Sequence, residues 1–149
     1  MLVYRICLAQ FATSLQASGR AARWNANHVK VIYTSSSLSL ACLENVVHRS
    51  HLGLNQNFRC LTIHIPDDLK ITEIKTAQLT QNWMDFSSLP STQEIGNNWI
   101  KDSKTPILKV PSSIILQENN FLINALHPDF DKITITANEP FVFDNRIKR

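Results

Sequence analysis

A strand and a helix follow each other directly in residues 23–48, RWNANHVKVIYTSSSLSLACLENVVH. Residues 29–34 alternate along the chain and are rich in β-branched side chains, a pattern that predicts a strand. The serines at positions 35–37 offer oxygens that can cap a helix, and apolar residues recur after them at helical spacing, so we predict a helix over residues 38–50. The stretch therefore requires a fold that combines strands with helices.

The rest of the chain predicts further strands and one more helix. The strand segments are residues 2–7, 58–65, 69–75, 106–110, 121–124, 132–136 and 140–143. A short helix is predicted over residues 92–100, and residues 76–86 read as weakly helical or loop. Because helices and strands do not alternate regularly, we predict an α+β fold: a single domain over residues 1–149 with a twisted, largely antiparallel sheet.

The composition is that of a folded globular protein, with 44% hydrophobic and 18% charged residues. The formal net charge of +3 is spread along the chain, which argues against a nucleic-acid interface. No apolar run is long enough to span a membrane, and the N-terminal residues lack the pattern of a signal peptide. We therefore expect a cytoplasmic protein that binds neither nucleic acid nor membrane directly.

Several common kinds of site are disfavoured by the sequence. The three cysteines, Cys7, Cys42 and Cys60, form no CxxC pair, so neither a zinc site nor a redox motif is indicated, and reduced thiols fit the cytosol. The three glycines cannot form a phosphate-binding glycine loop. The histidines lack an HExxH pattern, so we expect no metal site.

Three side chains near the N-terminus are of the types that hold an anionic nucleotide. Arg23 can bind phosphate oxygens through its planar guanidinium. Tyr33 can stack on a flat ring, and Glu44, on the shoulder of the apolar stripe of its helix, can stabilise a developing positive charge. Structural roles stay open for each: Arg23 can stack on Trp24, Tyr33 can simply pack, and Glu44 can face solvent. Ser112 follows a proline at a strand end, where serine is usually a turn former.

Several short motifs follow one another along the chain, each occurring once. They are GRAARWN (19–25), VIYTSS (31–36), LACLE (40–44) with His48, then Trp99, LKVPSS (108–113), NALHPDF (124–130) and FVFDNR (141–146). In this order and spacing they resemble the RES domain, a family of bacterial toxins named for its arginine, glutamate and serine. The resemblance runs almost from end to end, and only about residues 66–92 carry little signal.

The resemblance implies an activity and a partner. RES proteins are similar in fold to ADP-ribosyltransferase toxins and consume NAD by phosphorolysis or hydrolysis of the nicotinamide bond. NAD would then be the substrate, inorganic phosphate a co-substrate, and no resident cofactor would be needed. The family also implies an Xre-type antitoxin protein, bound in a heteromeric complex that covers the active site.

The resemblance also assigns roles to individual residues. It gives catalytic roles to Arg23, Glu44 and Ser112, substrate-binding roles to Arg5, Tyr33 and Asn124, and no residue to a metal. In the mechanism this implies, the arginines grip the diphosphate and ribose, Tyr33 borders the nicotinamide, and Glu44 stabilises an oxocarbenium ion on the ribose. Ser112 would orient the nucleotide or the incoming phosphate.

Two other functions remain open at this stage. A protein-directed ADP-ribosyltransferase would use the same residues with a protein side chain as acceptor. A catalytically idle RES-fold binding module would keep the fold and lose the charged set, whereas Arg23, Glu44 and Ser112 are all present here. Transfer of a label from NAD onto protein would distinguish the transferase from an enzyme that degrades NAD.

Overall fold

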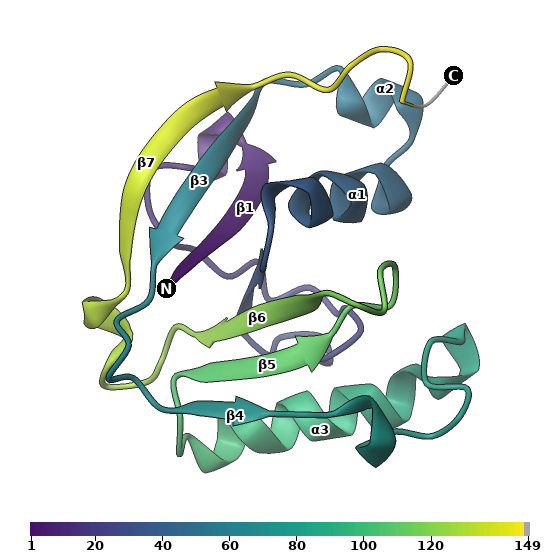
Figure 1. The fold of residues 1–149 in the computed structure, drawn as a ribbon, viewed down its shortest axis with the longest axis vertical. Coiled ribbons are helices and arrows are strands. Elements are labelled where there is room, and N and C mark those ends of the chain that lie inside the picture. The colour runs from purple at the N-terminus through teal and green to yellow at the C-terminus, as the bar shows by residue number, and fades with distance from the viewer. Residues whose placement is uncertain (148–149) are drawn as a thin grey trace.

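Seven strands form one sheet in the order β4-β5-β6-β2-β1-β3-β7 (Figure 1). The computed structural model describes residues 1–147, apart from the side chains of residues 51 and 52. The strands are β1 (Leu2–Leu8), β2 (Val31–Ser35), β3 (Phe58–His64), β4 (Ile71–Glu73), β5 (Ile107–Pro111), β6 (Asn119–Asn124) and β7 (Thr134–Phe141). All neighbouring pairs are antiparallel except β4 and β5. The predicted single α+β domain with a largely antiparallel sheet is therefore confirmed.

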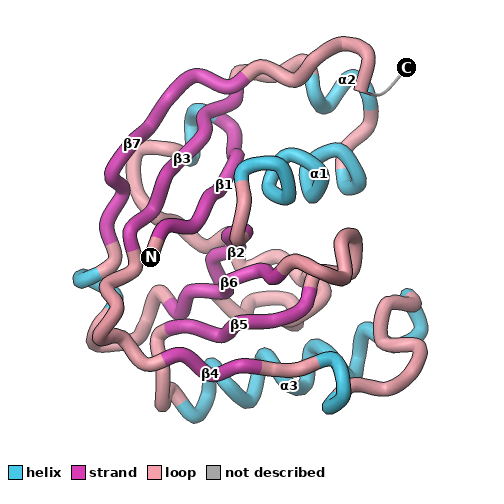
Figure 2. The backbone as a smooth tube through the Cα atoms, in the orientation of Figure 1, coloured by secondary structure: helices cyan, strands magenta, loops and turns pink. Residues whose placement is uncertain are grey.

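The sheet divides into two halves where β1 meets β2. β1 pairs with β3 along its whole length, whereas its pairing with β2 is at Tyr4 and Ser35. Figure 2 shows the two groups of strands diverging: β1, β3 and β7 run steeply in this view, and β4, β5 and β6 lie nearly across them. Ser35, the last residue of β2, thus lies at the junction of the two halves, just before the first helix.

Helix α1 (Leu38–His48) begins at a capped end and is shorter than the predicted 38–50. The Ser37 hydroxyl accepts a hydrogen bond from the backbone N–H of Leu40 at 3.1 Å, as an N-cap serine does. The helix stops because Arg49 adopts an extended backbone, with φ −124°. A separate short helix, α2 (His51–Leu54), then starts where Ser50 accepts a hydrogen bond from the N–H of Gly53.

Helix α3 (Leu89–Asp102) starts earlier than the predicted 92–100 because a proline occupies its first turn, where proline's missing N–H costs nothing. It ends where Ser103 takes a left-handed backbone with φ 47°. Between β4 and α3 lie two short 3₁₀ turns, Thr76–Gln78 and Phe86–Ser88, and two others lie at Ala9–Phe11 and Phe130–Lys132. Within residues 1–147, no helix combines the length and the apolar character needed to cross a membrane.

The C-terminal strand differs from the prediction. One continuous strand, β7, replaces the two predicted over residues 132–136 and 140–143. β7 pairs with β3 at the edge of the sheet, so its Pro140 is tolerated: an edge strand needs hydrogen-bond donors on one side only. β4 is also shorter than the predicted 69–75, because only Ile71–Glu73 pair with β5.

Apolar side chains pack on both faces of the sheet. On one face, Val3, Ile32 and Leu61 belong to a buried cluster that lies against the loop after β1. The opposite face holds two clusters, one built around three tryptophans with α3 and the other around Phe58 with α1. Because side chains alternate along a strand, Val31, Tyr33 and Ser35 all point to this second, helix-covered face.

Candidate functional site

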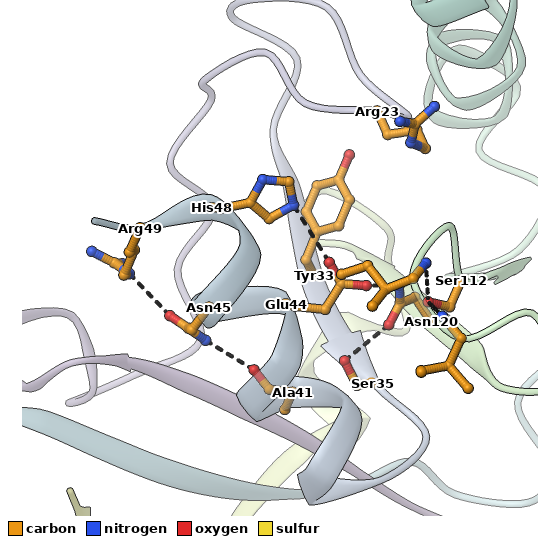
Figure 3. Close-up of polar contacts among 12 residues, drawn as sticks. Arg23, Tyr33, Ser35, Ala41, Glu44, Asn45, His48, Arg49, Ser112 and Asn120 are labelled. Carbon is orange, nitrogen blue, oxygen red and sulfur yellow. Dashed lines mark hydrogen bonds and ion pairs between the residues drawn. The ribbon is translucent and has the colours of Figure 1, made fainter. Parts of the chain in front are cut away.

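Arg23, Tyr33 and Glu44 come together from three separate segments (Figure 3). Tyr33 projects from β2, Glu44 from α1, and Arg23 from the loop before β2. Burial lowers the pKa of the Arg23 guanidinium, and the nearby Glu44, Tyr33 and Asp85 partly offset that shift by favouring its charged form. The three residues that the sequence singled out near the N-terminus are therefore close enough to interact electrostatically.

The loop that carries Arg23 is held by side chains of α3. Thr92 donates its hydroxyl hydrogen to the backbone carbonyl of Arg23 at 2.6 Å. Gln93 donates from Nε2 to the carbonyl of Ala22 at 2.8 Å. These bonds fix the peptide groups on both sides of Arg23, so α3 determines where the Arg23 side chain begins.

The same loop also approaches the backbone of α3 closely. A Cβ atom added at Gly96 would lie 1.7 Å from the carbonyl oxygen of Trp24, so only glycine fits at this position. The next residue of the helix, Asn97, accepts a hydrogen bond through its side-chain oxygen from the N–H of Ala26 at 3.0 Å. The loop and the helix are thus in direct backbone contact.

The guanidinium of Arg23 forms a fork onto a second loop. Nη1 donates to the carbonyl of Trp83 and Nη2 to the carbonyl of Met84, both at 2.8 Å. The cation lies 5.8 Å from the centre of the Trp83 ring. The structural alternative that paired Arg23 with Trp24 therefore named the wrong tryptophan, since Trp24 is buried and packs against Trp83. A guanidinium has five N–H donors, so this fork leaves capacity for an anionic ligand.

Tyr33 uses its hydroxyl within the protein. The hydroxyl donates to Oδ1 of Asn25 at 2.6 Å and accepts from the N–H of Trp24 at 3.1 Å. Burial raises the pKa of Tyr33 well above its usual range, so the phenol is neutral. The hydroxyl thus fixes the turn beside Arg23, and what Tyr33 can offer a ligand is the face or edge of its ring.

Glu44 is a partly exposed carboxylate with both oxygens near polar partners. Oε1 accepts a hydrogen bond from Nδ2 of Asn120 at 2.7 Å. Oε2 lies 3.5 Å from Nε2 of His48, one helical turn further along α1, and the Glu44 side chain is 23% exposed. A negative charge at this place can act on a cationic group that approaches from solvent.

Ser112 is completely buried and works as a turn former. Its hydroxyl oxygen accepts hydrogen bonds from the N–H groups of Ile114 and Ile115 at 3.0 and 3.1 Å. Its own N–H donates to the carbonyl of Glu118, which closes the hairpin between β5 and β6. Figure 3 shows Ser112 near Asn120. The structure therefore brings Ser112 to the base of the site, where it shapes the hairpin.

Arg5 and Asn124 lie apart from the cluster. Arg5 pairs with Leu61 across β1 and β3, so it points to the face of the sheet opposite Glu44. Asn124 is four residues beyond Asn120 on β6, a distance of about 13 Å along a strand. It is 1% exposed, and its Oδ1 accepts from the N–H of Leu126. The structure does not bring these two predicted substrate-binding residues to the site.

Asn120 was not predicted as a site residue. Ser35 was expected to offer a helix cap and one of three neighbouring hydroxyls, with no partner named for it. In sequence, Asn120 belongs to an Asn-Asn pair at the start of a strand, which reads as a turn signal. Its contact with Glu44 spans 76 residues and depends on the pairing of β2 with β6. Among the side chains described within residues 1–147, no group of three or more His, Cys, Asp or Glu residues could hold a metal ion.

Comparison with known proteins identifies close relatives over almost the whole chain. The family model described as the RES domain matches residues 2–144. A protein of Sphingobium sp. (strain YBL2), named Prs ADP-ribosylating toxin, is 36% identical over 129 residues, covering 85% of this chain and 80% of the relative. A protein of Yersinia enterocolitica named Toxin Res is 31% identical over 154 residues, covering 99% of this chain and 100% of the relative.

A solved structure with the same fold is also found. One chain of the crystal structure of the M. tuberculosis MbcT-MbcA toxin-antitoxin complex superposes with a TM-score of 0.77. The alignment covers 95% of this chain and 84% of that chain at 16% sequence identity. At that identity the likeness establishes the shared fold alone.

Proposed function

Because the chain belongs to the RES domain family, we propose that it is a toxin that degrades NAD by breaking the bond between nicotinamide and ribose. Phosphate or water accepts the ADP-ribose. The observation that carries this proposal is the convergence of Arg23, Tyr33 and Glu44, a cation, an aromatic ring and a carboxylate, from three segments of the fold.

The reaction needs little proton transfer. Nicotinamide in NAD is already cationic, so it leaves as a neutral molecule and the ribose takes up positive charge as an oxocarbenium ion. A fixed negative charge beside the ribose stabilises that ion more than it stabilises the substrate, which lowers the barrier. Glu44, with one oxygen held by Asn120 and a partly exposed side chain, supplies such a charge.

Binding of the substrate is assigned to the other two residues. The guanidinium of Arg23 takes the diphosphate through the N–H groups that its bonds to the carbonyls of Trp83 and Met84 leave over, and its position is set by α3. The ring of Tyr33 borders the nicotinamide, while its hydroxyl stays bound within the protein. NAD is a substrate in this scheme, and inorganic phosphate is the co-substrate when the reaction is a phosphorolysis.

An antitoxin is the proposed partner. The relatives carry the names of toxins, and the structural neighbour was solved as a toxin-antitoxin complex. A protein that consumes NAD inside the cell that makes it needs such an inhibitor. We assign the antitoxin to the Xre type from the family resemblance, and direct DNA binding then belongs to that partner.

A second function has a specific observation in its favour. The Sphingobium relative, at 36% identity, is named Prs ADP-ribosylating toxin. In a transferase of that kind, the same residues would activate NAD and a protein side chain would replace phosphate or water as acceptor. The two functions share every step up to the oxocarbenium ion and differ only in what attacks it.

One experiment separates these outcomes. The purified chain, free of antitoxin, is incubated with NAD with and without phosphate, and the products are resolved by proton and phosphorus NMR. Nicotinamide with a phosphorylated ADP-ribose signifies phosphorolysis, and plain ADP-ribose signifies hydrolysis. Intact NAD in both conditions, together with transfer of labelled ADP-ribose to a protein in a cell extract, would instead favour the transferase. Intact NAD without any transfer would contradict both.

A further inference from the structure

A short chain of hydrogen bonds links the carboxylate of Glu44 to the centre of the sheet. Ser35 donates its hydroxyl hydrogen to Oδ1 of Asn120 at 2.9 Å, and Asn120 donates from Nδ2 to Oε1 of Glu44 at 2.7 Å. Ser35 and Asn120 are direct partners in the pairing of β2 with β6, and Ser35 is 4% exposed. The chain therefore starts from a buried, well-fixed hydroxyl and ends at the proposed catalytic charge.

The charge of Glu44 decides which way the Asn120 amide points. A carboxylate is an acceptor only, so the amide must turn its NH₂ group toward Glu44 and its oxygen toward Ser35. Ser35 can donate to that oxygen, which satisfies the other end of the amide. The opposite orientation would place two acceptor oxygens against each other. One arrangement is thus strongly preferred, and each bond strengthens the next.

A second contact holds the same two segments together. The carboxylate of Glu118, just before β6, accepts hydrogen bonds from the hydroxyls of Ser36 and Ser37 at 3.3 and 2.6 Å. Glu44 follows Ser37 by seven residues, about two helical turns, so both positions lie on one side of α1. Glu118 therefore contacts α1 at its N-terminal end, and Asn120 contacts it at Glu44. These two contacts keep the helix from sliding along its axis.

Building on the proposed function, we propose that Asn120 and Ser35 are positioning residues for the reaction at NAD. They hold Oε1 of Glu44 inside the protein and thereby direct Oε2 toward the ribose. Oε2 lies 3.5 Å from Nε2 of the exposed His48. Neither Asn120 nor Ser35 needs to touch the substrate, since both act through Glu44.

A double-mutant cycle tests this pathway. Asn120→Ala removes a hydrogen bond to a charged group and should lower kcat roughly ten- to a hundredfold while changing KM less than about threefold. Glu44→Ala alone and Glu44→Ala with Asn120→Ala should turn over NAD at the same residual rate, because Asn120 has nothing left to position. The exposed Asn98→Ala on α3 is the matched control and should behave like the unaltered protein.

Ser35 gives a second test with its own rescue. Ser35→Ala frees the oxygen end of the Asn120 amide and should lower kcat by a smaller factor, whereas Ser35→Thr keeps the hydroxyl and should restore most of the rate. The exposed Ser39→Ala on α1 is its control. Independent, multiplying losses in the cycle, or a Ser35→Thr protein that folds yet stays as slow as Ser35→Ala, would overturn the proposal.

A readout without turnover keeps the proposal separate from the proposed function. In ¹⁵N-resolved NMR spectra, the side-chain NH₂ signals of Asn120 should move in Glu44→Ala and in Ser35→Ala, and should stay in place in Ser39→Ala. If the unaltered protein leaves NAD intact while these shifts appear, the function is wrong and the positioning of Glu44 stands. If NAD is consumed but the side-chain NH₂ signals of Asn120 do not move in Glu44→Ala, the proposed positioning role of Asn120 and Ser35 is wrong.

Discussion

Gly96 of α3 lies directly against the backbone carbonyl of Trp24, with room for a hydrogen atom and nothing larger. This contact joins the helix to the loop that carries Arg23, whose own carbonyl is bound by Thr92 one turn earlier on the helix. The position of the proposed diphosphate-binding cation is therefore set by a helix that contributes no charged group of its own to the site.

We expect Gly96→Ala to displace this loop. The added Cβ would overlap the Trp24 carbonyl at 1.7 Å, so the backbone must move, and overpacking of this kind typically costs about 1–3 kcal/mol. NAD turnover per folded molecule should fall as well, because Arg23 moves with the loop. Thermal unfolding and turnover measure the two effects. In Gly53→Ala, where the new Cβ meets only side-chain atoms at 3.4 Å or more, both should change little.

We expect Glu44→Ala to abolish most of the activity while the protein remains folded. The side chain is 23% exposed and fills no core position, so unfolding temperature should change little. Loss of a preorganised charge at the ribose should cost at least ~2.7 kcal/mol of barrier, about a hundredfold in rate. Nicotinamide release measures the effect. A Glu44→Ala protein with near-normal turnover would remove Glu44 from the mechanism.

We expect Arg23→Lys to fail although it keeps the positive charge. An ammonium group lacks the planar fork that reaches the carbonyls of Trp83 and Met84 together, and it cannot bind a diphosphate in the same bidentate way. KM for NAD should therefore rise, and the loop around Trp83 should loosen. Steady-state kinetics check this, with the exposed Arg20→Lys as the matched control. Equal KM values in both variants would contradict a bidentate role.

Much of the fold could be predicted from local pattern. The strand at residues 29–34 and the helix after the serines are encoded by neighbouring residues, so they appear in the structure with shifts of only a few positions. The exceptions have local physical causes, such as the second cap at Ser50 that divides the predicted helix. The prediction divides β7 at residues 137–139, Ala-Asn-Glu, which are weak strand formers, whereas their pairing with β3 keeps the strand continuous.

The site was predictable only in part. Arg23, Tyr33 and Glu44 lie within a short span of sequence, and strand-to-helix geometry alone brings two of them together. Asn120 could not be found in this way, because its contact with Glu44 depends on which strands pair. Arg5 has a side chain suited to the role assigned to it, yet the alternation of β1 turns it to the opposite face.

We expect Ser112→Ala to act mainly on stability. The substitution leaves two backbone N–H groups, those of Ile114 and Ile115, without their acceptor in a buried turn, which should cost about 1–3 kcal/mol. Turnover should fall only as far as the hairpin that carries Asn120 loosens. Denaturant unfolding and kcat, measured on the same preparation, distinguish the two roles. A full loss of kcat at unchanged stability would instead indicate that Ser112 contacts the substrate directly.

We expect Tyr33 to make stability depend on pH in the alkaline range. Burial raises the pKa of its phenol in the folded protein, whereas the unfolded chain titrates near the usual value of about 10. The folded state thus holds the proton more tightly, so the stabilisation is complete below about pH 10 and is lost progressively as the pH rises further. Urea unfolding at about pH 8 and about pH 10.5 measures this loss.

Tyr33→Phe tests the assignment of that alkaline loss. The variant should be less stable at neutral pH, by about 1–3 kcal/mol, because the N–H of Trp24 and Oδ1 of Asn25 lose their shared partner. It should also lose less stability between about pH 8 and about pH 10.5 than the unaltered protein, since the buried phenol is gone. Tyr4→Phe, at a half-buried tyrosine of β1, is the control. If the two phenylalanine variants lose equal stability with rising pH, the alkaline loss does not come from Tyr33.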